Sequence, residues 1–80
     1  GFNSNLVNAL GSRSREKLWL EINRALRAGD APEMLHGLLH WKARALRDRA
    51  LSLELITLLQ TSRRTGLDLS LSLECFALSL

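Results

Sequence analysis

Two histidines, His36 and His40, are the first residues whose spacing suggests chemistry. Side chains four positions apart share one face of a helix, and two imidazoles placed in this way can bind one metal ion. The residues between them are one glycine and two leucines, so no neighbouring carboxylate is available to act as a base. The only other soft ligand, Cys75, lies far along the chain. We therefore expect no metal and no cofactor, and we interpret both histidines as surface or boundary residues.

Cys75 is the one candidate thiol nucleophile. Such a thiol needs a partner base and cationic surroundings, whereas its neighbours Leu73, Phe76 and Leu78 are typical of a core, so we expect Cys75 to be buried. The chain has no Gly-rich phosphate loop and no Gly-x-Ser-x-Gly motif, and the sequence therefore predicts a protein that is not an enzyme. A single cysteine cannot form an internal disulfide, which favours a reducing, cytoplasmic compartment.

One short stretch concentrates basic side chains, and its members are Lys42, Arg44, Arg47 and Arg49. Trp41 precedes them and only Asp48 opposes them, so this stretch is an alternative candidate for contact with a nucleic-acid backbone. On a helix these side chains would spread around more than half of the circumference, which is more typical of a solvated face. The formal net charge of +3 is a weak indication of nucleic-acid binding. We expect any direct contact with DNA to be weak.

The composition decides the fold class. With 80 residues, of which 46% are hydrophobic and 24% charged, the chain matches one globular domain over residues 1–80. Its apolar residues are mainly leucine rather than β-branched or aromatic residues, which predicts an all-α protein and excludes a β-sandwich. The longest uncharged stretch, residues 55–62, is far shorter than the ~20 residues of a membrane span. We expect no membrane contact.

Caps, stops and apolar periodicity predict a bundle of about five helices with short connections, over residues 4–10, 13–28, 31–47, 52–65 and 69–79. The residues expected to begin or end helices are Ser4, Gly11, Gly29, Asp30 with Pro32 and Glu33, Ser52, Gly66, and Asp68 or Ser70. The apolar stripes expected to face the core include Leu18, Trp19 and Ile22, then Leu35, Leu39, Ala45 and Leu46, then Leu55, Ile56, Leu58 and Leu59. The charged side chains beside the first of these stripes, Glu21 among them, are expected to face solvent.

Residues 67–73 alternate strictly between leucine and polar residues, which on periodicity alone indicates a strand. We predict a helix instead, because leucine is a poor strand former and no second strand is available for pairing. The helical interpretation places Leu69, Leu73, Phe76 and Leu80 on one face.

Several segments resemble the C-terminal domain of the delta subunit of the bacterial DNA polymerase III clamp loader. They are Phe2, residues 7–11 (VNALG), 13–17 (RSREK), 29–32 (GDAP), 38–44 (LLHWKAR), 62–68 (SRRTGLD) and 73–78 (LECFAL). The family often has Asp at the position of Asn8, and it usually has a longer segment between the basic third helix and the closing helices. This shortening leads us to expect irregular chain between Asp48 and Ser52.

The resemblance implies a collar domain, a non-catalytic helical module through which clamp-loader subunits assemble in DNA replication. Its expected partners are the other subunits of the loader. An all-α domain rich in leucine agrees with this role, because apolar helix faces outside its own core can pack against partner helices. The residues expected to contribute to the partner contact are Leu69, Leu71, Leu73, Phe76, Leu78 and Leu80.

Overall fold

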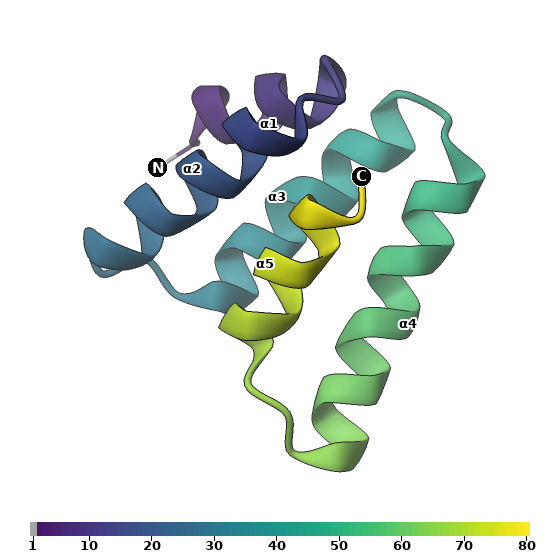
Figure 1. Ribbon diagram of the computed structural model, residues 1–80. Coiled ribbons are helices and arrows are strands. Elements are labelled where there is room, and N and C mark those ends of the chain that lie inside the picture. Colours follow the sequence, from purple (N-terminus) through teal and green to yellow (C-terminus); the bar gives the residue numbers. More distant parts are fainter. Residues whose placement is uncertain (1) are drawn as a thin grey trace.

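The computed structural model describes residues 2–80 and consists of five helices (Figure 1). They are α1 (Ser4–Gly11), α2 (Arg15–Arg27), α3 (Pro32–Ala45), α4 (Arg49–Thr65) and α5 (Leu69–Leu78). The α1 helix packs against α2 and α3, α4 packs mainly against α3, and α5 packs against α2, α3 and α4. The prediction of a small all-α bundle is confirmed, and residues 69–73 of the alternating segment are helical.

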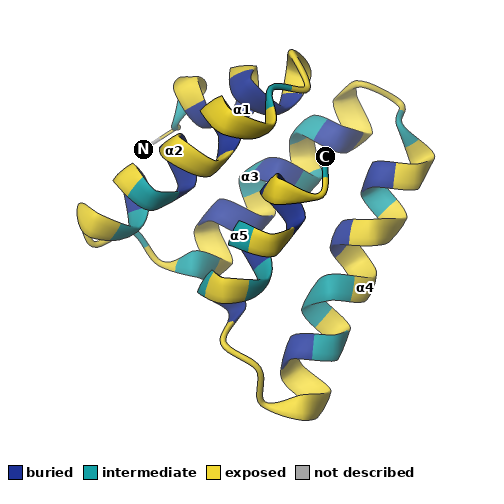
Figure 2. Cartoon of the chain, in the orientation of Figure 1, coloured by how far each residue is buried: buried dark blue, intermediate teal, exposed yellow. Residues whose placement is uncertain are grey.

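Every helix contributes leucine or isoleucine side chains to one core. The largest fully buried side chains are Leu6, Leu10, Leu18, Ile22, Leu35, Leu39, Leu55 and Leu73. Figure 2 shows the buried residues on the sides of the helices that face one another. Burying one such side chain stabilises the folded state by about 1.5 to 3 kcal/mol, so this shared core is the main stabilising feature of the bundle. None of the described helices is both long enough and apolar enough to span a lipid bilayer.

The same turn ends α1, α2 and α3. In each case one residue adopts a left-handed conformation, namely Arg13 (φ 54°), Gly29 (φ 95°) and Arg47 (φ 56°). The next backbone N–H then donates to the carbonyl of a buried alanine in the last turn, and these pairs are Ser14 to Ala9, Asp30 to Ala25, and Asp48 to Ala43. This is the Schellman motif, which satisfies carbonyls that the helix leaves free. Gly29 ends its helix as predicted. Gly11 was also predicted to end a helix, but it is still helical, and Arg13 adopts the left-handed conformation at the end of α1 instead.

Side-chain caps begin four of the helices. Asn3, Ser14, Asp48 and Asp68 each accept a hydrogen bond from a backbone N–H in the first turn. The expected cap at Asp68 is confirmed, but the caps predicted at Ser4 and Ser52 are wrong. The capping box predicted at Asp30 is also wrong, because Asp30 belongs to the turn that ends α2 and α3 begins without a side-chain cap. Pro32 stands at the start of α3, where no backbone donor is needed.

The irregular chain expected between the third and fourth helices lies slightly earlier than predicted. It covers Leu46 to Asp48, and residues 49–52 already belong to α4. The reason is the left-handed Arg47, which ends α3 and leaves Asp48 extended and positioned to cap Leu51 at 3.0 Å. Asp48 also forms an ion pair with Arg13, so the α1–α2 and α3–α4 turns are joined.

Several predicted core residues are exposed. Trp19, Leu46 and Ile56 each expose more than a third of their surface, and Ala45 is exposed as well. These residues lie at the edges of stripes that are narrower than expected, because each helix of a small bundle has only a few neighbours. Cys75 is also exposed, contrary to prediction. It lies two positions from the buried Leu73 and therefore on the opposite side of α5.

Candidate protein-interaction groove

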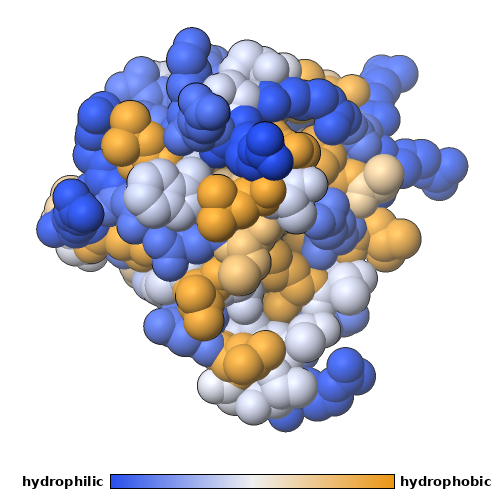
Figure 3. Space-filling model, in the orientation of Figure 1, coloured by the Kyte–Doolittle hydropathy of each residue, from blue (hydrophilic) through white to orange (hydrophobic). Residues whose placement is uncertain are grey.

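An open groove of about 810 Å³ lies between α4 and α5. Its apolar walls include Leu53, Leu58, Leu67, Leu71 and Phe76. Figure 3 shows apolar side chains on this face of the molecule, over the region between α5 and α4. A continuous apolar surface of this kind is typical of a site where another molecule binds.

Three leucine side chains that line the groove are more than half exposed to solvent. Leu53 is 64% exposed, Leu71 55% and Leu67 54%. The buried side of α4, formed by Leu51, Leu55 and Ser62, faces the rest of the bundle. Leu53 is two positions from both Leu51 and Leu55, so it lies on the opposite side of α4 and projects away from the core. These leucines add little to the stability of the isolated fold, because folding removes only part of their surface from water.

The turn that connects α4 and α5 forms one end of the groove. Gly66 ends α4 in a left-handed conformation (φ 73°), as predicted from the sequence. The hydroxyl of the buried Ser62 donates to the carbonyl oxygen of Leu67 at 2.6 Å. Asp68 then caps α5 by accepting from the Ser70 backbone N–H at 3.0 Å. These two hydrogen bonds fix the place at which Leu67 lines the groove.

The six residues predicted to contact a partner fall into three groups in the structure, buried, exposed and partly buried. Leu69, Leu73 and Phe76 are buried, so they belong to the core of this chain, although part of Phe76 also lines the groove. Leu71 lines the groove and is exposed, Leu78 is exposed outside it, and Leu80 is partly buried against the core.

Sequence reasoning missed Leu53, the most exposed large apolar residue of the described chain. The residue lies on α4, whereas the predicted contact lay on α5 alone. The sequence does contain an indication that Leu53 is exposed. Leucines occupy the alternate positions 51, 53 and 55, and three residues spaced in this way cannot all lie on one face of a helix.

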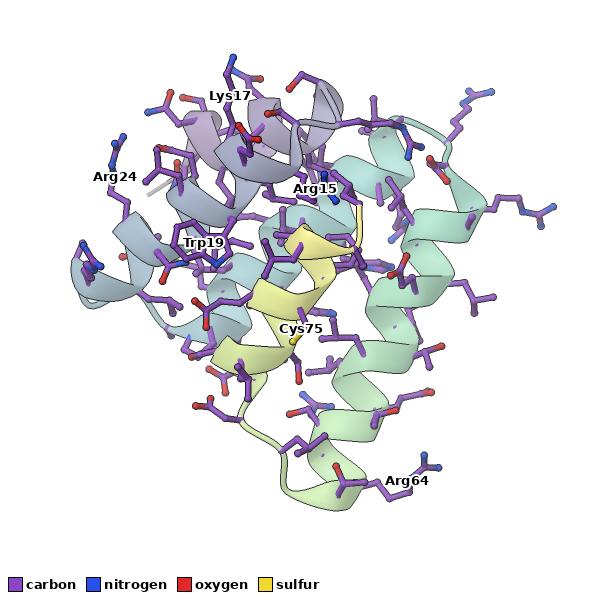
Figure 4. All side chains as sticks on the ribbon, viewed as in Figure 1. Arg15, Lys17, Trp19, Arg24, Arg64 and Cys75 are labelled. Carbon is purple, nitrogen blue, oxygen red and sulfur yellow. The ribbon has the colours of Figure 1, made fainter. Side chains whose placement is uncertain are left out.

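The polar groups of the groove include two carboxylates. Glu54 on α4 and Asp68 at the start of α5 line it, and no Lys, Arg or His is among the lining residues. Cys75 is another lining residue, and Figure 4 shows its side chain pointing from α5 toward α4.

The four basic residues predicted to contact nucleic acid do not form one surface. Arg44, Arg47 and Arg49 line a shallow hollow of about 190 Å³ at the α3–α4 turn. Lys42 is partly buried and extends toward Gly11. The two residues are so close that a Cβ atom added to Gly11 would lie 3.1 Å from Lys42 Cε. Trp41 is exposed and packs edge-on against Phe2, with ring centroids 5.4 Å apart.

The two histidines connect α3 to α4. His36 is 7% exposed, and its Nε2 donates to the carbonyl oxygen of Leu55 at 2.8 Å. The Nε2 of His40 lies 3.1 Å from the Ser52 hydroxyl, and the two imidazoles stack with centroids 6.2 Å apart. The interpretation of both as surface or boundary residues is therefore wrong for His36. Within residues 2–80 no three His, Cys, Asp or Glu side chains are grouped so that they could hold a metal ion.

Burial lowers the pKa of His40 below its ordinary value of 6.5, and the neighbouring His36 and Arg44 lower it further. Folding therefore favours the neutral imidazole of His40.

A second, more polar hollow of about 490 Å³ lies between α1 and α2. Its lining includes Lys17, Glu21 and Arg24, and Glu21 accepts a hydrogen bond from Arg24 at 2.8 Å. Glu21 is buried, so the prediction that it faces solvent is wrong. Its pairing with Arg24 explains how a charged side chain is accommodated there. Figure 4 shows Lys17 and Arg24 extending outward from α2.

Comparison of the sequence with family models and with curated proteins, and of the fold with solved structures, gives no match.

Proposed function

We propose that this chain is a non-catalytic helical assembly domain that binds another protein through the groove between α4 and α5. The observation that carries the proposal is the exposure of Leu53, Leu67 and Leu71 along one hollow. These side chains are large and apolar, and contact with a partner would remove them from water.

The resemblance to the collar domain of the clamp-loader delta subunit supports a more specific role. We propose that the partners are other subunits of a bacterial DNA polymerase III clamp loader, and that the compartment is the cytoplasm. The matching segments extend from Phe2 to Leu78. In such an assembly this domain contributes a packing surface, while ATP hydrolysis and clamp opening belong to other parts of the loader.

The first experiment measures assembly with the other clamp-loader subunits by light scattering and by isothermal titration calorimetry. The double variant Leu53→Ala, Leu71→Ala should weaken assembly by about 1 to 3 kcal/mol, because each change removes apolar contact area from the lining of the groove. Helical content should stay unchanged, since both side chains are exposed in the isolated chain.

A matched control is the pair Leu20→Ala, Leu46→Ala. These leucines are 48% and 44% exposed but lie outside the groove lining. The control should assemble as the parent does. Assembly of the groove variant with unchanged affinity would refute the groove as the binding surface.

A second candidate function, nucleic-acid binding, is favoured by the three arginines around the α3–α4 turn. Only a few phosphates can be contacted there at once, so we expect weak, sequence-independent binding that decreases steeply with salt. Fluorescence anisotropy with a labelled DNA duplex tests this expectation. Submicromolar binding at physiological salt that is abolished by Arg44→Glu, Arg47→Glu would make this candidate the primary function.

A further inference from the structure

The charge of the groove is opposite to the charge of the chain as a whole. The chain has 11 Lys and Arg against 8 Asp and Glu, for a net charge of +3. The groove nevertheless has two carboxylates, Glu54 and Asp68, and no basic side chain among its lining residues. Both acidic residues are exposed beside the apolar walls.

We propose that the groove binds an amphipathic helix of another protein, whose apolar stripe contacts Leu53 and Leu71 and whose flanking Lys or Arg residues pair with Glu54 and Asp68. This inference rests on the proposed function and specifies the chemistry of the partner. Complementary charge of this kind selects a partner and orients it, while the apolar contact supplies most of the affinity.

The dimensions of the groove fit a helix of about three turns. Its shorter wall, α5, has 10 residues and is therefore about 15 Å long. On α5, Leu71 and Cys75 line the groove at an interval of four, and Leu67 of the preceding turn comes four positions before Leu71. On α4, Leu53 is followed by Thr57 at the same interval. Rows of side chains at this interval accept a helix whose apolar residues recur at i, i+3 or i+4, and i+7.

Electrostatics favour a different protein over a second copy of this chain. Two copies with a net charge of +3 each repel one another, whereas a basic segment is attracted to the two carboxylates. The side chains of Ala50, Ser72 and Cys75 on the walls of the groove are small, which allows a helical ligand to approach the backbone of α4 and α5 closely.

Two synthetic helical peptides of about four turns provide the test. Both present the same leucine stripe, and one has lysine on either side of it while the other has glutamate. Titration into the ¹⁵N-labelled chain, followed by two-dimensional NMR, reports both the affinity and the binding site. We expect the lysine peptide to shift the amides of residues 50–58 and 67–79 and to bind about three- to ten-fold more tightly than the glutamate peptide at low salt.

The preference should depend on the two groove carboxylates. The variant Glu54→Gln, Asp68→Asn removes both charges and retains an oxygen at position 68 that can cap α5. This variant should bind the two peptides equally, and salt at about 0.5 M should reduce the preference of the parent chain. The control Glu16→Gln, Glu33→Gln neutralises two exposed acids outside the groove and should preserve the preference.

The outcomes separate this inference from the proposed function. Equal affinity of the two peptides for the groove of the parent chain would overturn the inference and leave the groove as a binding surface. Shifts of groove amides that depend on the concentration of the free protein would assign the groove to a second copy and also overturn it. If neither peptide shifts the groove amides and the clamp-loader subunits do not shift them either, the proposed function fails as well.

Discussion

Replacement of His36 tests whether the buried contact between α3 and α4 stabilises the bundle. The imidazole is 7% exposed, and its Nε2 donates to the Leu55 carbonyl at 2.8 Å. His36→Phe keeps a ring of similar size but loses this hydrogen bond. His36→Ala loses both the hydrogen bond and the packing of the ring against its neighbours.

The expected magnitudes follow from these two losses. A hydrogen bond of this kind contributes about 0.5 to 1.5 kcal/mol to the free energy of unfolding, so His36→Phe should cost about 1 kcal/mol. Truncation of a buried side chain adds a cavity, and His36→Ala should therefore cost about 3 kcal/mol. For a domain of this size each kcal/mol lowers Tm by about 4 to 8 °C. The Ala variant should unfold at least about 12 °C below the parent.

Thermal and urea unfolding followed by far-UV circular dichroism measure both effects. His40→Ala is the matched control, since His40 is only partly buried and lies one turn further along the same helix. Its cost should be smaller than that of His36→Ala. If His36→Ala unfolds at the same temperature as the parent, or if His40→Ala is the more destabilising change, the assignment of His36 to the core is refuted.

Three further predictions concern pH, backbone strain and the extent of the interface. Folding lowers the pKa of His40, so the contribution of His40 to the free energy of unfolding should be complete above pH 6.5, the ordinary pKa of histidine, and should decrease as the pH falls below 6.5. In urea titrations at several pH values, His40→Gln should weaken this pH dependence. Arg47 has a φ of 56°, so Arg47→Gly should relieve left-handed strain and raise the free energy of unfolding by about 0.5 to 1 kcal/mol, whereas the same change at the helical Arg44 should be destabilising. Leu78 is exposed but does not line the groove, so Leu78→Ala should leave peptide binding unchanged, and an effect on assembly with whole subunits would show that the interface continues along α5.

The fold class and the approximate positions of the helices follow from the sequence, because leucine periodicity and the glycines at 29 and 66 are local signals. The details that were wrong depend on backbone geometry or on neighbouring helices. Arg13 and Arg47 adopt left-handed conformations that are usually taken by glycine, so residue type alone does not predict them. The burial of His36 depends on the Leu55 carbonyl of another helix, which the spacing of the histidines does not reveal.

The candidate site was predicted only in part for the same reason. Leu71 was one of the residues expected to contact a partner, and it is exposed. The other wall of the groove lies on α4, and the pairing of the two walls exists only after the chain has folded. The acidic character of the groove likewise arises from two residues that are 14 positions apart in the sequence, Glu54 and Asp68.

The repeated turn that ends the first three helices has a consequence for the order of folding. The turns that connect α1 to α2 and α3 to α4 are short and close through local hydrogen bonds, so these pairs lose little loop entropy when they form. By contrast, α5 packs against α2, from which it is separated by two helices along the chain. We therefore expect the contacts of α5 to form after the transition state for folding, so that Leu73→Ala mainly accelerates unfolding, whereas Leu10→Ala also slows folding.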